Sequence, residues 1–222
     1  MKKFTCLDTA PMPDGATISL HEHDGSYSVR VSGIELMSTR HHSSEEKLAE
    51  LACAHVGKSR GARILIGGLG LGFTLRAALK ALAGDASVTV AEISDAIIRW
   101  NRNPSYPLAS DVLADARVTL IEKDVGEVIR ATTGGFDSIA LDVDNGPDAL
   151  CSDGNSRLYD AEGLRRARAA LRKGGCLAIW SALPDPAFEK ALARAGFAGE
   201  VQRCRAHGNS GSRHAIFLGF PR

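Results

Sequence analysis

The sequence predicts an α/β fold: a mostly parallel sheet with helices on its faces, an antiparallel hairpin at its C-terminal end and a small β piece at its N-terminus. An apolar strand at residues 63–67 runs into a glycine turn and a helix, and apolar strands then alternate with amphipathic helices. The last two predicted strands follow each other with no helix between them, which makes them antiparallel. The chain of 222 residues is long enough for one such domain with a substantial core.

The composition is that of an ordinary globular protein. Its net charge of +1 gives no electrostatic reason to expect a nucleic-acid partner, and no stretch approaches the about 20 apolar residues of a membrane span. The N-terminus carries two lysines without a following apolar run, so we expect no signal peptide. The five cysteines include no C-x-x-C pair, which disfavours a disulfide framework or a zinc site and predicts a cytoplasmic protein.

The N-terminal part is predicted to be a β-hairpin piece of two or three strands, covering residues 1–42. Strands at 17–23 and 27–31 flank the dipeptide Asp24-Gly25, which is a strong hairpin turn signal. A third short strand is expected at residues 34–37.

The second predicted unit, residues 43–222, is the main α/β domain. Ser43 and Glu46 have the spacing of a capping box, which predicts that a helix starts at Ser43. Further helix N-caps are expected at Ser94, Asp160 and Asp185. Parallel strands are predicted at 63–67, 88–91, 118–121, 136–141 and 176–181, followed by the hairpin strands 200–205 and 214–219.

The glycine turn indicates a nucleotide or nucleoside site. Gly68, Gly70 and Gly72 alternate as G-x-G-x-G, and a helix that opens after such a turn points free N–H groups into the same crevice. A tight strand-to-helix turn can also need glycine for structural reasons alone. A dinucleotide site wants G-x-G-x-x-G, but Phe73 occupies the later slot, so the spacing favours an S-adenosylmethionine-binding transferase over an NAD-dependent oxidoreductase.

Three acidic residues follow successive predicted parallel strands. Glu92 comes 20 residues after Gly72, an offset at which a carboxylate typically accepts hydrogen bonds from the ribose hydroxyls. Asp124 is placed to accept a hydrogen bond from the adenine amino group, and Asp142 lies where the transferred group would be. Each alone could be an N-cap or a solvated strand end. Their shared position at the sheet edge of the glycine turn favours a binding role.

The long polar loop that begins at Val143 brings a second carboxylate close to Asp142. Asp142 and Asp144 could face one acceptor amine and take its proton or hold its charge, and the alternative is a pair that stays solvated. No metal site is expected, because the pairs His21/His23 and His41/His42 lack the third or fourth convergent ligand that a metal needs.

From about residue 17 to residue 180 the sequence resembles the spermidine synthase family. Residues 63–76 match the family's strand, glycine motif and T-L-R continuation, and Ala91-Glu92-Ile93 matches its V-E-I. Residues 136–142 resemble its Y-D-V-I-I-x-D, and the stretches 158–159 and 170–175 match later family motifs.

The resemblance implies a class I S-adenosylmethionine-dependent methyltransferase fold, in a short and divergent form. It implies S-adenosylmethionine or decarboxylated S-adenosylmethionine as donor substrate without a metal, a small-molecule acceptor such as an amine, and a homodimer. It also implies that Asp142 is the base that activates the amine. The cofactor-binding residues that we expect are Gly68, Leu69, Gly70, Gly72, Glu92, Ile93, Asp124, Val125 and Asp142.

The chain departs from the family at two places that bear on its chemistry. Leu71 stands where the family's aspartate holds the aminopropyl end of the donor, and Ser44-Glu45 replaces a tyrosine-histidine pair. Aminopropyl transfer and methyl transfer therefore both stay open. A non-catalytic protein that retains the nucleoside pocket is a further alternative.

Overall fold

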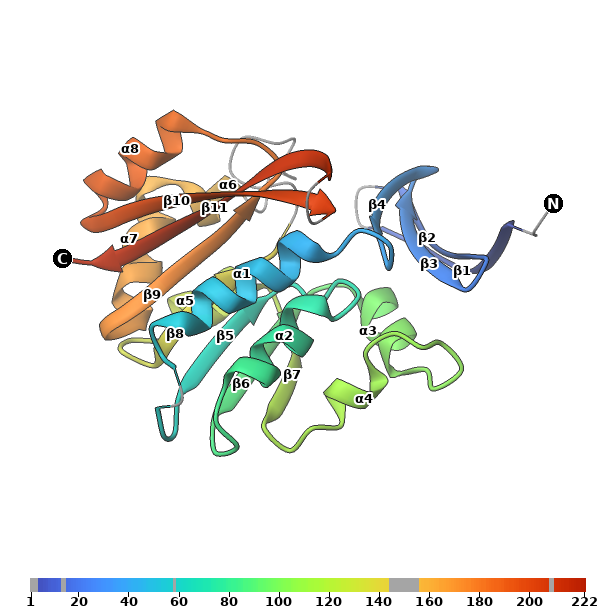
Figure 1. The fold of residues 1–222 in the computed structure, drawn as a ribbon, viewed down its shortest axis with the longest axis horizontal. Coiled ribbons are helices and arrows are strands. Elements are labelled where there is room, and N and C mark those ends of the chain that lie inside the picture. Colours follow the sequence, from blue (N-terminus) through green and yellow to red (C-terminus); the bar gives the residue numbers. More distant parts are fainter. Residues whose placement is uncertain (1–3, 13–14, 58, 144–155, 208–209) are drawn as a thin grey trace.

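The computed structural model describes residues 4–12, 15–57, 59–143, 156–207 and 210–222. Two sheets organise these residues, a large one that carries most of the helices and a small N-terminal one at the opposite end of the molecule from the C-terminus (Figure 1). Among the described residues, no helix is long and apolar enough to cross a membrane.

The large sheet has seven strands in the order β10-β11-β9-β8-β5-β6-β7. Neighbours from β9 to β7 are parallel, whereas β11 is antiparallel to both β9 and β10, so the predicted fold class and terminal hairpin are confirmed. The strands are β5 (Arg63–Gly67), β6 (Ser87–Glu92), β7 (Val118–Glu122), β8 (Phe136–Leu141), β9 (Leu171–Ser181), β10 (Phe197–His207) and β11 (Ser210–Pro221).

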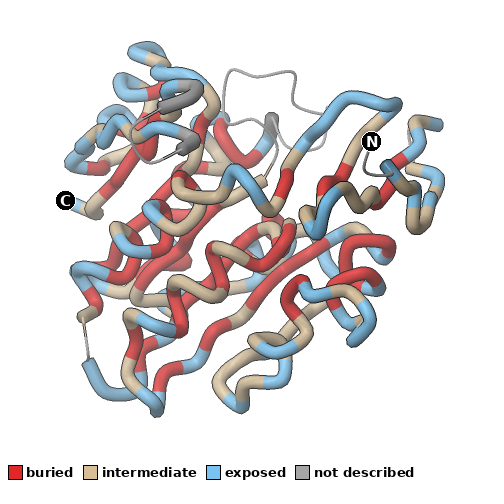
Figure 2. The backbone as a smooth tube through the Cα atoms, turned by 45° about the vertical axis from the view of Figure 1, so that its right-hand side comes forward, coloured by how far each residue is buried: buried red, intermediate tan, exposed pale blue. Residues whose placement is uncertain are grey.

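Helices cover both faces of this sheet and bury two apolar layers. Alternate residues of one strand serve opposite layers: Ile64 and Ile66 pack with α1, α2 and α3, whereas Leu65 packs with α5, α7 and α8. Figure 2 shows the buried strands between these helices. The helices are α1 (Ser43–Ala54), α2 (Phe73–Ala81), α3 (Asp95–Arg102), α4 (Ser110–Leu113), α5 (Val125–Arg130), α6 (Ser156–Tyr159), α7 (Ala161–Ala170) and α8 (Pro186–Arg194).

Helix starts were predicted well with one exception. The side chains of Ser94, Asp160 and Asp185 accept N-cap hydrogen bonds, as expected. The helix predicted to start at Ser43 does begin there, but the N-cap of α1 is His42, one residue earlier than the capping box implied, and it makes no side-chain cap hydrogen bond. The Glu46 carboxylate lies 3.3 Å from the His42 imidazole instead.

The small sheet has four antiparallel strands, one more than the largest number predicted. The missed strand is β1 (Phe4–Pro11), which precedes β2 (Thr17–His23), β3 (Ser26–Val31) and β4 (Ile34–Ser38). Polar and apolar residues do not alternate cleanly in β1, whose pairing with β2 shifts between Cys6 and Asp8. The Trp100 indole of α3 donates a 2.7 Å hydrogen bond to the Asp8 carboxylate, so a tertiary contact fixes this strand.

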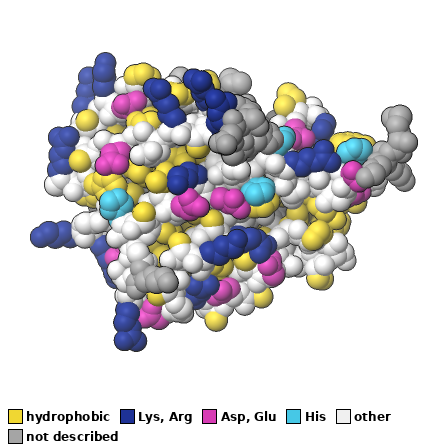
Figure 3. Space-filling model, viewed as in Figure 1, with side chains coloured by type: hydrophobic (Ala, Val, Ile, Leu, Met, Phe, Trp, Pro, Cys, Tyr) yellow, Lys and Arg dark blue, Asp and Glu magenta, His cyan; other side chains and the backbone are white. Residues whose placement is uncertain are grey.

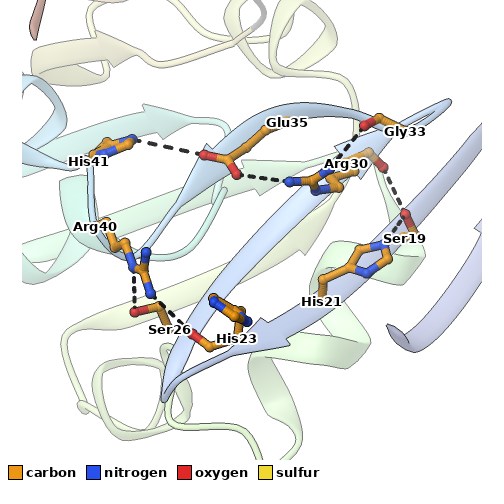
Figure 4. A network of polar contacts seen from close by, with 9 residues as sticks. All are labelled: Ser19, His21, His23, Ser26, Arg30, Gly33, Glu35, Arg40 and His41. Atoms are coloured by element: carbon orange, nitrogen blue, oxygen red, sulfur yellow. Dashed lines mark hydrogen bonds and ion pairs between the residues drawn. The ribbon is translucent and has the colours of Figure 1, made fainter. Parts of the chain in front are cut away.

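Side chains of the small sheet are linked by polar contacts. The Arg30 guanidinium donates to the Glu35 carboxylate over 3.4 Å, and the Arg40 guanidinium donates to the Ser26 hydroxyl over 2.8 Å (Figure 4). On its other side the sheet contributes Ile18 to the apolar layer that also contains Leu71, so the two predicted units share one core. Charges of both signs are interspersed over the molecular face in Figure 3.

Candidate active site

The glycine turn connects β5 to α2 at the carboxyl edge of the parallel strands. Gly68, Gly70 and Gly72 have φ angles of 88°, 52° and 82°, a region that residues with side chains rarely adopt. A methyl group on Gly68 would collide with the backbone carbonyl oxygen of Asp142, and one on Gly72 would collide with Ala109. These glycines therefore let the turn approach the end of β8 closely.

Glu92, at the end of β6, holds this turn in place. Its carboxylate is buried and accepts hydrogen bonds from the backbone N–H groups of Leu69, at 2.9 Å, and Ser94, at 2.8 Å. The Asn101 side chain adds a 2.8 Å hydrogen bond to the Gly70 carbonyl. Each carboxylate oxygen can accept a second hydrogen bond, so Glu92 keeps capacity for two hydroxyl groups of a ligand.

The other expected adenosine contacts lie around Glu92. Ile93 follows it directly and is 70% exposed, which makes it an open apolar surface beside the turn. Asp124 is the N-cap of α5 and accepts a 2.9 Å hydrogen bond from the backbone N–H of Glu127. Val125 is buried against Gly67. Asp124 is thus an N-cap, the structural alternative to adenine binding. Only its Oδ1 accepts the capping hydrogen bond, and its second carboxylate oxygen, Oδ2, does not.

Asp142 follows β8 and carries a strongly perturbed carboxyl group. Its backbone N–H donates to the Gly67 carbonyl over 2.8 Å, and its Oδ2 accepts a 2.6 Å hydrogen bond from the Thr74 hydroxyl. The pKa of Asp142 is raised to about 7, first by desolvation of the carboxyl group and then by the negative charge of Glu45, while the Thr74 hydrogen bond opposes the shift. Asp144, the other predicted catalytic residue, lies outside the described residues.

The pKa of Asp142 predicts a pH-dependent change in stability. Asp142→Asn should raise the melting temperature above that of the wild type at about pH 8 and leave it nearly unchanged at about pH 4. The carboxyl group has an ordinary pKa of 3.8, so between 3.8 and about 7 the folded state binds the proton more tightly than the unfolded state, and this group's contribution to stability falls as the pH rises. Calorimetry of both proteins over this range is the measurement, and a difference that grows toward acidic pH would contradict the assignment.

Two polar residues beside Asp142 were not predicted, Thr74 of α2 and Glu45 of α1. The Thr74 hydroxyl, besides donating to Asp142, lies 3.4 Å from the Glu45 backbone carbonyl. Burial raises the pKa of the Glu45 carboxyl. A signal for Glu45 was present in the sequence, because Glu45, Leu48 and Ala52 follow the i, i+3, i+7 spacing of one helix face. That face packs toward the interior.

The apolar residues of the turn point into the protein. Leu69 and Leu71 are both buried, at 4% and 6% exposure, in the layer shared with the small sheet. Met37 of β4 lies against Gly70, and the His42 ring stacks on Phe73 with 4.1 Å between the ring centroids. The small sheet and the segment after it therefore cover one side of the turn.

Solved structures that share this fold include spermidine synthases. One, in complex with the transition state analogue AdoDATO, superposes with a TM-score of 0.73 at 21% identity, covering 96% of this chain and 72% of that chain. Another, from Thermotoga maritima, has a TM-score of 0.74 at 19% identity with the same coverages. The chain has a spermidine synthase-like fold. No protein-family model and no curated protein matches its sequence.

The spermidine synthase-like fold confirms the predicted resemblance at the level of architecture. Almost the whole chain takes part, including the small N-terminal sheet, since 96% of it is covered. Identity near 20% does not carry the roles of single residues across, so these depend on the contacts described above.

Proposed function

We propose that this protein transfers an aminopropyl group from an S-adenosyl sulfonium donor to a small amine. The observation that carries the proposal is Asp142: a half-buried carboxyl group, whose pKa is raised to about 7, lies at the carboxyl edge of the sheet, against the glycine turn. The spermidine synthase-like fold supports this choice of chemistry, because one of the structures that share it was solved with a transition state analogue.

The donor would be held by the residues around the turn. The hydrogen-bonding capacity that Glu92 retains suits the two ribose hydroxyls, and the exposed Ile93 offers an apolar surface to the adenine. The free oxygen of Asp124 suits an adenine amino hydrogen. The other residues that we propose for donor contact are Gly68, Leu69, Gly70, Gly72 and Val125.

The chemical step needs little beyond positioning and one proton transfer. Asp142 takes a proton from the ammonium group of the acceptor, and the freed amine attacks the carbon next to the sulfonium sulfur. A C–N bond forms, the C–S bond breaks, and its electron pair neutralises the sulfonium as a thioether. Because Asp142 has to be ionised to accept the proton, we expect the rate to rise with pH through about 7.

The direct test measures which donor binds and which product forms. The protein is titrated separately with S-adenosylmethionine, its decarboxylated form and NADH, and then incubated with short aliphatic monoamines and diamines before mass spectrometry. We expect binding of an S-adenosyl compound and a product heavier by one aminopropyl group. Binding of NADH alone would overturn the proposal, and donor binding without any modified amine would leave a nucleoside-binding protein.

Methyl transfer is the second candidate, and Leu71 favours it. This buried apolar side chain stands where the family resemblance places the aspartate that holds the aminopropyl end of the donor. The same incubation separates the two activities by mass, because methyl transfer adds one methyl group to the amine, whichever donor supplies it, and aminopropyl transfer adds the heavier aminopropyl group.

Glu92→Gln should weaken the binding of S-adenosylhomocysteine roughly tenfold to a hundredfold, the cost of losing hydrogen bonds to a charged group. The amide retains one acceptor oxygen and sets an NH₂ group against the N–H of either Leu69 or Ser94. Isothermal titration calorimetry measures the change. Glu122→Gln is the control, since Glu122 is exposed at the same level of the neighbouring strand. Equal affinities for both variants would remove Glu92 from the donor site.

A further inference from the structure

We propose that Glu45 is a second carboxylate of the acceptor site, which together with Asp142 binds the cationic amino group of the acceptor, and that Ser44 and His214 are its positioning residues. This inference rests on the proposed function, because it concerns the acceptor of that reaction. Its structural part, the pairing of two carboxylates, can be tested without any turnover.

A network of two hydrogen bonds, from His214 through Ser44 to Glu45, fixes the Glu45 side chain. The Ser44 hydroxyl donates a 2.6 Å hydrogen bond to Glu45 Oε2, and His214 Nδ1 lies 3.0 Å from the same hydroxyl oxygen. A hydroxyl group has one proton, so a Ser44 hydroxyl that donates to Glu45 requires the His214 tautomer with its proton on Nδ1. These hydrogen bonds link the start of α1 to β11, 170 residues later in the sequence.

The His214 imidazole is itself held in place by an aromatic contact. The His214 ring meets the edge of Trp180, at the end of β9, with 4.8 Å between ring centroids and 73° between ring planes. The buried Ser44 is only 1% exposed. Two strands of the sheet and the first turn of α1 therefore converge on the Glu45 carboxylate.

Glu45 and Asp142 act on each other electrostatically. The negative charge of Glu45 contributes to the raised pKa of Asp142, second only to burial. Thr74 lies between them, since its hydroxyl donates to Asp142 and approaches the Glu45 carbonyl. Two carboxyl groups that share a site in this way do not ionise independently.

The pair has no lysine or arginine partner among the described residues, and the nearby group that can become positively charged is the His42 imidazole. Within the part of the chain that the structure describes, no lysine or arginine forms an ion pair with either carboxylate, and Lys47, the nearest in sequence, pairs with Glu50 at 2.9 Å. The ionisable groups around the pair are His42, Glu46 and Lys47 of the α1 region, Glu92 of β6, Cys204 of β10 and His214 of β11.

A half-buried pair of carboxylates without a lysine or arginine partner is costly in free energy, so it either keeps a proton or accepts a positive charge from a ligand. An ammonium group supplies that charge and three hydrogen-bond donors. When Asp142 then takes one proton from the ammonium, Glu45 keeps its negative charge and stabilises the positive charge that returns to nitrogen as the C–N bond forms.

The structural part is tested by carbon NMR of the Asp142 carboxyl group in the ligand-free protein. Glu45→Gln removes a like charge and should lower the titration midpoint of Asp142 by about one pH unit or more. Glu50→Gln is the matched control, because Glu50 is exposed on the same helix and should leave the midpoint unchanged. An unchanged midpoint in Glu45→Gln would overturn the pairing, whatever reaction the protein catalyses.

The acceptor part is tested by amine binding and kinetics. With short diamines as probes, Glu45→Gln should raise the dissociation constant or KM of the amine roughly tenfold or more, the loss of a charge-assisted hydrogen bond, and leave the donor KM unchanged. Ser44→Ala and His214→Asn should have smaller effects of the same kind, and Glu45→Asp should recover part of the loss. Equal increases of both KM values, or diamines that fail to shift the Asp142 resonance of the wild type, would overturn the acceptor role.

Discussion

Asp142→Asn is expected to lower the turnover rate about a thousandfold while leaving donor affinity within about twofold. The amide keeps the shape of the side chain and can still accept the 2.6 Å hydrogen bond from Thr74, but it cannot take a proton from an ammonium group. Its backbone contact with Gly67 is also retained. Single-turnover kinetics and donor titration on the same preparation separate the two effects.

The outcome is specific only if replacing other carboxylates has no such effect. Asp95→Asn provides the comparison, since Asp95 is exposed on α3 and pairs with Arg99 at 2.8 Å. We expect wild-type turnover from that variant. If Asp142→Asn turns over at the wild-type rate, another group must accept the proton, and the proposed role of Asp142 is wrong.

Gly68→Ala is expected to destabilise the fold by about 3 kcal/mol or more and to abolish measurable donor binding. The φ angle of 88° alone disfavours alanine by about 1–2 kcal/mol. The added methyl group would also have to displace the backbone carbonyl of Asp142, which couples the turn to the candidate base. Urea unfolding gives the change in free energy, and calorimetry gives the change in affinity.

Gly84→Ala is the matched control for this substitution. Gly84 lies between α2 and β6, its φ angle is ordinary, and no atom lies within 4 Å of the position of an added methyl group. We expect a change in the free energy of unfolding within about 1 kcal/mol and unchanged donor affinity. Two glycine variants of equal stability would show that the close approach at Gly68 imposes no constraint.

The elements of the large sheet were predictable because their signals are local. Each buried parallel strand is a short apolar run, and four of the described helices start at side chains that cap their own backbone. Strand β1 was missed because its local pattern is irregular and its position depends on contacts with β2 and with Trp100. The capping-box spacing located the start of α1 but placed its N-cap one residue late, because a two-residue spacing pattern cannot tell which of two neighbouring residues is the cap.

Some features of the candidate site could likewise be predicted from local sequence signals, whereas others depend on tertiary contacts. The glycine spacing and the acidic residues that end β6 and β8 are properties of the sequence, because topology brings the carboxyl ends of parallel strands to one edge. The sequence by itself therefore determined the fold class, the glycine turn and the position of Glu92 and Asp142 at one edge of the sheet. Only the tertiary structure decided that the half-buried Asp142 lies close to Glu45, and that His214 reaches Ser44 across 170 residues. A pKa depends on desolvation and on charges close in space, and neither can be read from the order of residues along a chain.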